Sequence, residues 1–160
     1  MVQNSEWGPP LWDILHTCAS RCGRQTVTLL HKDEVRAWCA LLQLTEAILP
    51  CPMCQNHYRA WLKANPVKHF LDLSPTAFHE AAQTWLWRLH NSINVQRSVG
   101  ELSLSEAKAI YAEKRTADLE KSLKKLLQVL DEAKLQRLID GIFARDWKGK
   151  LSKLRALIGI

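Results

Sequence analysis

The residues best suited to chemistry are two cysteines, Cys51 and Cys54, which enclose Pro52 and Met53. Pro50 can end one helix and Pro52 can begin the next, which places Cys51 at a helix N-terminus and Cys54 one turn further on the same face. The unpaired N–H groups and the dipole of a helix N-terminus stabilise a thiolate, so we expect Cys51 to be the more acidic thiol. Thiols at this spacing can close an easily reduced disulfide, which suits electron transfer.

Zinc binding is an alternative use of the same pair. A structural zinc site needs four ligands, and the run of Cys51, Cys54 and His57 supplies three at most, with no second CxxC in the chain. A thioredoxin-like site would need alternating strands and helices, whereas the chain has almost no strand pattern. We therefore interpret the pair as a redox dithiol in a helical protein, and a zinc-stabilised helical interaction module is the alternative function.

Hydrophobic periodicity predicts the helices that must position these cysteines. Each predicted helix has a start signal, and a Pro or Asn-Pro ends two of them. The predictions are residues 11–22 after Pro9 and Pro10, a second helix capped by Asp33 and stopped by Pro50, a third from Pro52 to Asn65, a fourth from Ser74-Pro75 to about Asn94, and a short fifth over 103–115 behind the capping box of Ser103 and Glu106.

The chain changes character at about Thr116. Apolar residues there form amphipathic stripes that are separated near Gly141 and Gly149, without any Cys or His. These stripes predict extra bundle helices or a surface for a dimer or another partner. The sequence thus predicts an all-α protein, in which residues 1–115 form a four-helix bundle with a short fifth helix and residues 116–160 form a C-terminal amphipathic helical extension.

Composition excludes several classes of protein. The chain has 160 residues, of which 47% are apolar and 24% charged, so it is neither disordered nor of low complexity. The net charge is +6, and the basic side chains alternate with acidic ones at helical spacing. This alternation is typical of a solvated surface and predicts no nucleic-acid partner. No apolar run of about 18 residues and no signal peptide are present, which predicts no membrane span and residence where cysteines are reduced.

Two further clusters indicate a cofactor. Trp12 and His16 lie four residues apart on one helix face, and His90, Asn91 and Asn94 project together from the end of the fourth helix, with Arg97 just beyond. Aromatic planes, imidazoles, amides and a cation are the groups that a planar heteroaromatic cofactor with a phosphate arm requires.

Taken together, three motifs resemble the Erv/ALR-type FAD-linked sulfhydryl oxidases. They are the WGxxxWxxxH run from Trp7 to His16, the CxxC from Cys51 to Cys54, and the HNxxN run from His90 to Asn94. The resemblance covers about residues 6–112 and is greatest to the compact members encoded by large cytoplasmic DNA viruses.

This resemblance implies that the chain is an FAD-dependent thiol oxidase that forms disulfide bonds in substrate proteins and passes the electrons to O2, with H2O2 as product. It implies catalytic roles for Cys51, which would accept electrons from the substrate, and Cys54, which would react with the flavin. The cofactor-binding residues that it implies are Gly8, Trp12, His16, Cys54, Tyr58, His90, Asn91, Ile93, Asn94, Arg97 and Tyr111, with no metal.

The resemblance also implies partners and a location. A homodimer and a thioredoxin-like or other dithiol protein substrate are expected, in the host cytoplasm or the virion, or alternatively in the mitochondrial intermembrane space. Many relatives carry a structural disulfide that begins three residues before the HN pair, where this chain has Trp87, and no cysteine follows Cys54. We therefore expect substrates to reach Cys51 directly.

Three cysteines remain after this assignment. Cys18, Cys22 and Cys39 lie on apolar helix faces, where thiols are normally buried and reduced. We expect no bond between Cys18 and Cys22, because one helix turn holds their side chains nearly parallel.

Overall fold

A computed structural model describes all 160 residues, and it contains helices without any strand. This confirms the all-α prediction. The elements are α1 (Asn4–Arg21), α2 (Thr28–Thr45), the short 3₁₀ helix η1 (Glu46–Ile48), α3 (Pro52–Ala64), the 3₁₀ helix η2 (Val67–Asp72), α4 (Pro75–Gln96), α5 (Leu104–Ala112), α6 (Thr116–Leu135) and α7 (Gly141–Ile158).

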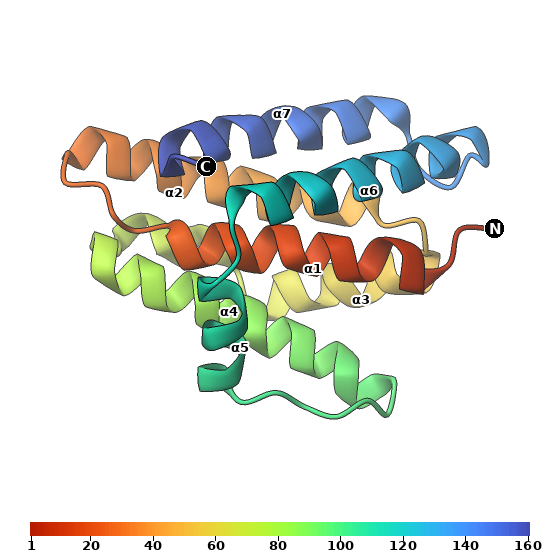
Figure 1. Cartoon of the computed structure of the whole chain (residues 1–160), viewed down its shortest axis with the longest axis horizontal. Helices are drawn as coiled ribbons and strands as arrows, with labels where there is room; N and C mark the ends of the chain where they lie inside the picture. The colour runs from red at the N-terminus through yellow and green to blue at the C-terminus, as the bar shows by residue number, and fades with distance from the viewer.

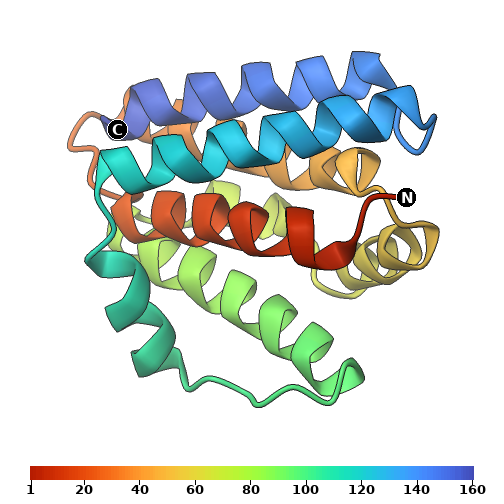
Figure 2. The ribbon, with the colours of Figure 1, turned by 45° about the vertical axis from the view of Figure 1, so that its right-hand side comes forward.

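Helix α1 lies in the middle of the molecule (Figure 1). Helix α6 runs along one side of α1, and α4 and α5 pack on the other side, while α7 packs along α2. The turned view in Figure 2 shows the same order, with the start of α3, the N-terminus and the turn between α6 and α7 at one end of the molecule. This order gives α1 contacts with most of the elements that could build a site.

Three predicted helix starts are confirmed by their capping residues. Pro52 is the first residue of α3, behind Cys51 at the N-cap. The Ser74 hydroxyl accepts a hydrogen bond from the Ala77 N–H and opens α4, and Ser103 and Glu106 form the predicted capping box of α5. These signals act within one turn, so the local sequence is sufficient to set them.

The predicted start of the first helix is wrong. Helix α1 begins at Asn4, and Pro9 and Pro10 lie inside it rather than before it. Each proline removes one backbone donor near the helix start, and the carbonyls that lose a partner belong to Ser5 and Glu6, which are exposed and accessible to water. The helix therefore continues through the proline pair, and it gains nearly two turns that the sequence did not predict.

The predicted start of the second helix is also wrong. Helix α2 begins at Thr28, and Asp33 lies within it, paired with Arg36 at 3.5 Å instead of capping the helix. The first turns carry exposed Leu29 and buried Glu34. In most helices the apolar residues are buried and the charged residues exposed, and here the reverse holds. Hydrophobic periodicity therefore does not predict this part of the helix.

The C-terminal extension, residues 116–160 (hereafter the tail), forms two long helices, α6 and α7, that share the core of the molecule. Its buried residues belong to the same apolar cluster as those of α1, α2 and α4, and they include Leu126 and Leu130 of α6 and Trp147 and Leu154 of α7. The predicted break near Gly149 is wrong, because α7 continues through it. Gly149 lies on the exposed side of α7, so its low helix propensity costs only about 1 kcal/mol against that packing.

The three remaining cysteines are confirmed as buried and free. Burial raises the pKa of Cys18 to about 12 and that of Cys39 to about 11, and it also raises the pKa of Cys22. None of the helices combines the length and apolar character that crossing a membrane requires.

Candidate redox and cofactor site

The site begins at the first turn of α3. Cys51 and Cys54 form a disulfide there, with their Cα atoms 5.1 Å apart. Cys51 is the N-cap of α3, and its Sγ accepts a hydrogen bond from the Cys54 N–H at 3.2 Å. Both residues are partly exposed, while Met53 between them is 78% exposed. The bond is therefore accessible to a partner, and a backbone donor is in place to stabilise a Cys51 thiolate.

Helix α1 connects this disulfide to the predicted aromatic cluster. The Nδ2 atom of Asn4 lies 3.8 Å from the Cys54 Sγ. Asn4, Gly8, Trp12 and His16 follow at intervals of four residues, so they form one stripe about 18 Å long on the surface of α1. The sequence analysis missed Asn4, and the signal that could have found it is its position four residues before Gly8.

Four rings from three helices lie at the far end of this stripe. Trp12 of α1 stacks on His90 of α4, with ring centroids 4.1 Å apart and planes 9° from parallel. His16 of α1 stacks on Tyr111 of α5 at 4.4 Å and 7°. The two pairs meet where His16 Nε2 lies 3.2 Å from His90 Nδ1. The structure therefore brings these four predicted residues together.

The two histidines are neutral at physiological pH. Burial and the neighbouring His90 lower the pKa of His16 to about 3, and burial lowers the pKa of His90 to about 4. Two neutral imidazoles can share one N–H between their facing nitrogens. Burial, with a contribution from Asp13, raises the pKa of Tyr111 to about 12, so its hydroxyl keeps its proton.

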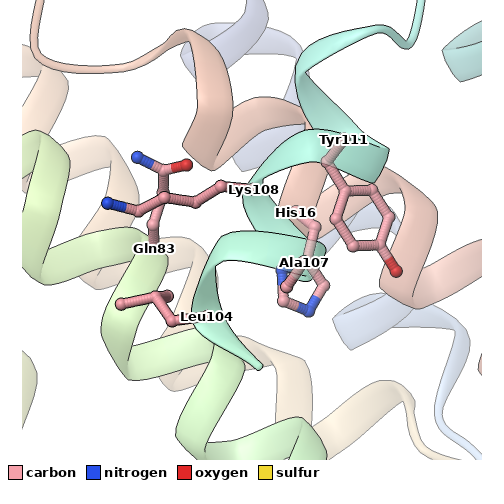
Figure 3. Close-up of a pocket in the computed structure, with 6 residues that line it drawn as sticks. All are labelled: His16, Gln83, Leu104, Ala107, Lys108 and Tyr111. Carbon is pink, nitrogen blue, oxygen red and sulfur yellow. The ribbon is translucent and has the colours of Figure 1, made fainter. Parts of the chain in front are cut away.

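A small cavity lies beside the His16 and Tyr111 rings (Figure 3). Its volume is about 10 Å³, which is room for a single water molecule. Gln83 and Lys108 line it from α4 and α5, and neither was predicted. Lys108 forms an ion pair with Glu80 at 2.5 Å, across the gap between the same two helices.

The end of α4 carries the remaining predicted residues with different degrees of burial. Ile93 and Asn94 are half-buried, and Arg97 is exposed at the C-cap. Asn91 is buried, and both of its polar side-chain atoms bond the backbone of Leu102. Asn91 is therefore engaged with the segment that leads into α5.

Tyr58 and His57 follow the disulfide on α3. The Tyr58 ring is buried edge-on against Trp85, 6.4 Å between centroids, and its hydroxyl donates to the Leu42 carbonyl. The structure places Tyr58 in the core and shows no contact with the four rings. His57 bonds Ser92 and Gln96 of α4, so the residue that was considered as a third zinc ligand has other partners. No group of three or more His, Cys, Asp or Glu side chains is placed to hold a metal ion.

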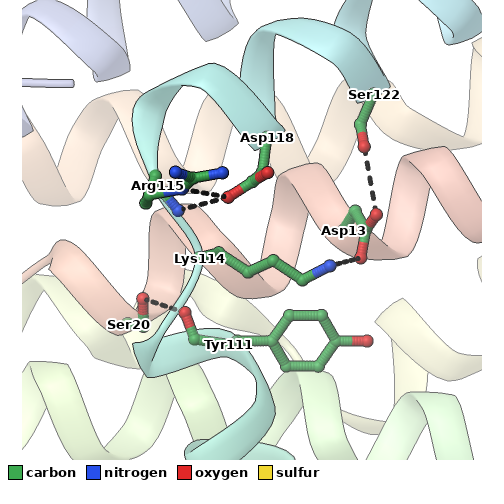
Figure 4. Close-up of polar contacts among 7 residues, drawn as sticks. All are labelled: Asp13, Ser20, Tyr111, Lys114, Arg115, Asp118 and Ser122. Carbon is green, nitrogen blue, oxygen red and sulfur yellow. Dashed lines mark hydrogen bonds and ion pairs between the residues drawn. The ribbon is translucent and has the colours of Figure 1, made fainter.

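The C-terminal end of α5 is tied to α1 (Figure 4). The Ser20 hydroxyl lies 3.4 Å from the Tyr111 carbonyl, and Asp13 accepts from Lys114 at 3.4 Å and from Ser122 of α6 at 3.0 Å. Asp13 directly follows Trp12, so these contacts link the stacked rings to α5 and α6.

The residues fit an FAD cofactor by their chemistry. A Cβ built on buried Gly8 would meet no atom within 4 Å, which leaves space on the stripe between Asn4 and Trp12. Four aromatic faces, the Asn94 amide and the Arg97 cation supply stacking, edge hydrogen bonds and charge.

Comparisons with known proteins place the same segment in one family. The model of the Erv1 / Alr family matches residues 9–115. An FAD-linked sulfhydryl oxidase of African swine fever virus, isolate Malawi, is 34% identical over 66% of this chain and 79% of its own length. The corresponding protein of the Kenya isolate is 33% identical over the same shares. The FAD-linked sulfhydryl oxidase ERV1 of rice is 29% identical over 62% of this chain and 45% of its own length.

No solved structure is similar enough to this chain to count as a match. The family model covers well over half of the chain, and the predicted resemblance is confirmed. This chain therefore belongs to the Erv1 / Alr family.

Proposed function

We propose that this protein is an FAD-dependent thiol oxidase that makes disulfide bonds in substrate proteins and reduces O2 to H2O2. One observation carries the proposal: the disulfide at the start of α3 and the aromatic cluster of α1, α4 and α5 lie along one stripe of α1, from Asn4 beside Cys54 to His16. A reactive disulfide and a set of planar rings along the same helix face supply the two parts that dithiol oxidation through a flavin requires.

The disulfide performs the first step. A substrate thiolate attacks the Cys51 Sγ, the Cys51–Cys54 bond breaks, and the released electron pair leaves as the Cys54 thiolate. A second substrate thiolate then attacks its partner in the mixed disulfide, which releases Cys51 as a thiolate and leaves the substrate oxidised. The Cys54 N–H donates to the Cys51 Sγ at 3.2 Å and stabilises this second leaving group.

FAD, when bound, would supply a two-electron acceptor for the reduced cysteine pair, with O2 as the final oxidant. We propose that Gly8, Trp12, His16, His90 and Tyr111 hold it, with Ile93, Asn94 and Arg97 at the end of α4. Cys54 would be the cysteine that reacts with it, and the Cys54 Sγ lies 3.8 Å from Asn4 Nδ2 at the head of the α1 stripe. The neutral state of His16 and His90 lets both imidazoles stack without a buried charge.

The proposal is tested by the visible spectrum and by cysteine variants. We expect purified protein to show flavin absorbance and to consume O2 with reduced dithiothreitol. Cys51→Ser and Cys54→Ser should each abolish oxidation, by a factor of at least about 10³, because either change removes the disulfide. Cys39→Ser is the matched control, since this thiol is buried and free. Colourless protein that contains stoichiometric zinc would contradict the proposal and favour the helical interaction module.

The finer expectations about partners and place are also proposals. The substrate is a thioredoxin-like or other dithiol protein that reaches Cys51 directly, and the active form is a homodimer. Residues 1–115 hold the cofactor, and 116–160 form a packing, dimer or partner element. The viral relatives favour the host cytoplasm or the virion, and the plant relative favours the mitochondrial intermembrane space as the alternative. Light scattering and pull-down with a Cys54→Ser trap, which retains the mixed disulfide at Cys51, test the oligomer and the substrate.

A further inference from the structure

Two side chains of α4 form hydrogen bonds with the segment that leads into α5. Trp87 and Asn91 lie one turn apart, and the Trp87 Nε1 and the Asn91 Nδ2 each donate to the Leu102 carbonyl at 2.7 Å. The Asn91 Oδ1 accepts from the Leu102 N–H at 3.2 Å. We call these three residues the Leu102 clamp. Both polar atoms of Asn91 are thus bonded to the backbone of one residue.

The clamp fixes the place where α5 begins. After α4 the chain runs back beside that helix as an irregular segment, which Figures 1 and 2 both show. Leu102 is near its end, directly before the capping residue Ser103. Since α5 is a single helix of nine residues, its starting point and direction determine where Tyr111, in its last turn, meets His16.

Helix α5 depends on such contacts because it has little stability of its own. It has nine residues, fewer than the roughly 12 to 15 that an isolated helix needs. Its only buried residues are Ala107 and Tyr111. The capping box and the bonds from Ser20 and Arg21 hold its ends, and the Leu102 clamp is its polar link to α4 before the first turn.

We propose that Trp87 and Asn91 are positioning residues, which hold α5 through Leu102 and so keep Tyr111 in the cofactor site. Asn91 then acts through the Leu102 backbone and does not bind FAD itself. This inference rests on the proposed function for the identity of the ligand, whereas the clamp itself is a property of the protein without it.

Trp87→Phe tests the clamp, because it keeps a large ring and removes only the N–H donor. We expect amide hydrogen exchange across residues 102–111 to become about two- to tenfold faster, as the loss of one hydrogen bond implies. The dissociation constant for FAD should rise by a similar factor, while turnover at saturating FAD remains that of the wild type. Trp61→Phe is the matched control, since the Trp61 Nε1 is buried without a hydrogen-bond partner, and exchange across 102–111 should not change.

Asn91→Leu separates positioning from direct binding. It removes two bonds to Leu102, so exchange across 102–111 should accelerate more than in Trp87→Phe, and the spectrum of the bound flavin should match that of Trp87→Phe. A change of the flavin spectrum in Asn91→Leu that Trp87→Phe does not share would show contact with the cofactor and overturn the positioning role. Unchanged exchange in both variants would overturn the clamp. If wild-type protein bound no FAD, the proposed function would fail, and hydrogen exchange on the same protein would still decide whether the clamp holds α5.

Discussion

At the scale of single residues, the site combines an accessible disulfide with a protected ring cluster. Cys51 and Cys54 are partly exposed at the start of a helix, whereas His16 is 5% exposed and stacked on Tyr111. This contrast fits the proposed function, in which the disulfide meets a protein partner and the rings hold the cofactor away from water. Different residues are therefore expected to govern substrate access and cofactor retention.

Met53 is expected to govern access for protein substrates. It is 78% exposed between the two cysteines, so it lies where a partner must dock. We expect Met53→Lys to raise the KM for a protein dithiol about three- to tenfold, because it replaces apolar contact area with a solvated charge. Oxidation of dithiothreitol should not change. Leu29→Lys is the control, since Leu29 is 65% exposed in the first turn of α2. Figure 1 shows that this end of α2 lies away from α3. Equal effects of the two changes would contradict this role.

The buried imidazoles make stability depend on pH. The pKa values of His16 and His90 are about 3 and about 4 in the folded protein, below the value near 6.5 of an unfolded chain. Their contribution is complete above about pH 6.5 and is lost as the pH falls toward 4 for His90 and toward 3 for His16, because the unfolded state takes up protons that the folded state excludes. Each histidine then lowers the free energy of unfolding by up to about 1.4 kcal/mol per pH unit.

Urea unfolding at pH 7 and pH 5 measures this effect. His16→Gln should lose part of the decrease in stability between the two pH values. His69→Gln, at an exposed histidine, should retain the full decrease. An unaltered pH dependence in His16→Gln would show that His16 is not the source.

At the scale of the elements, helix ends explain which predictions were correct. Pro52, Ser74 and Ser103 give their signals within a turn, and the structure confirms all three. The starts of α1 and α2 were predicted too late, because Pro9 and Asp33 carry the same local signal whether they begin a helix or lie inside one. Packing along the full length of each helix decided those cases.

Substitutions at two glycines test whether local helix propensity or tertiary contact determines the free energy of unfolding. Gly149 is exposed on the outer side of α7 and has open space around the position of a Cβ, so Gly149→Ala should raise the free energy of unfolding by about 0.5 to 1 kcal/mol. Gly23 has φ of +72° and a Cβ there would lie 2.4 Å from the Pro75 carbonyl oxygen, so Gly23→Ala should destabilise the protein by more than about 1 kcal/mol. Chemical denaturation measures both, and effects of the same sign would contradict this account.

At the scale of the whole molecule, the tail is part of the core. The side chain of Trp147 is fully buried, and its Nε1 donates to the Thr45 hydroxyl of α2 at 3.1 Å. Through α1 and α2, helices α6 and α7 support the elements that carry the ring cluster and precede the disulfide. Loss of tail packing should therefore destabilise the entire fold.

Trp147→Ala should lower the free energy of unfolding by about 3 to 5 kcal/mol, as for other large-to-small changes in a core. Thermal unfolding, followed by circular dichroism, gives the size of the change. Phe143→Ala in the same helix is the control, because Phe143 is 45% exposed and should cost much less. A separate, earlier transition confined to part of the helical signal would indicate that the tail unfolds by itself.

The sequence by itself determined the helical class, the redox pair at a helix start and most of the ring residues, because capping and helical period are local properties. Tertiary structure alone decided that Asn4 meets Cys54, that His90 stacks on Trp12, and that Trp87 and Asn91 hold Leu102. These contacts join residues 11 to 78 positions apart in the chain. A helical pattern shows which side chains share a face, but only the packing of helices determines which faces meet.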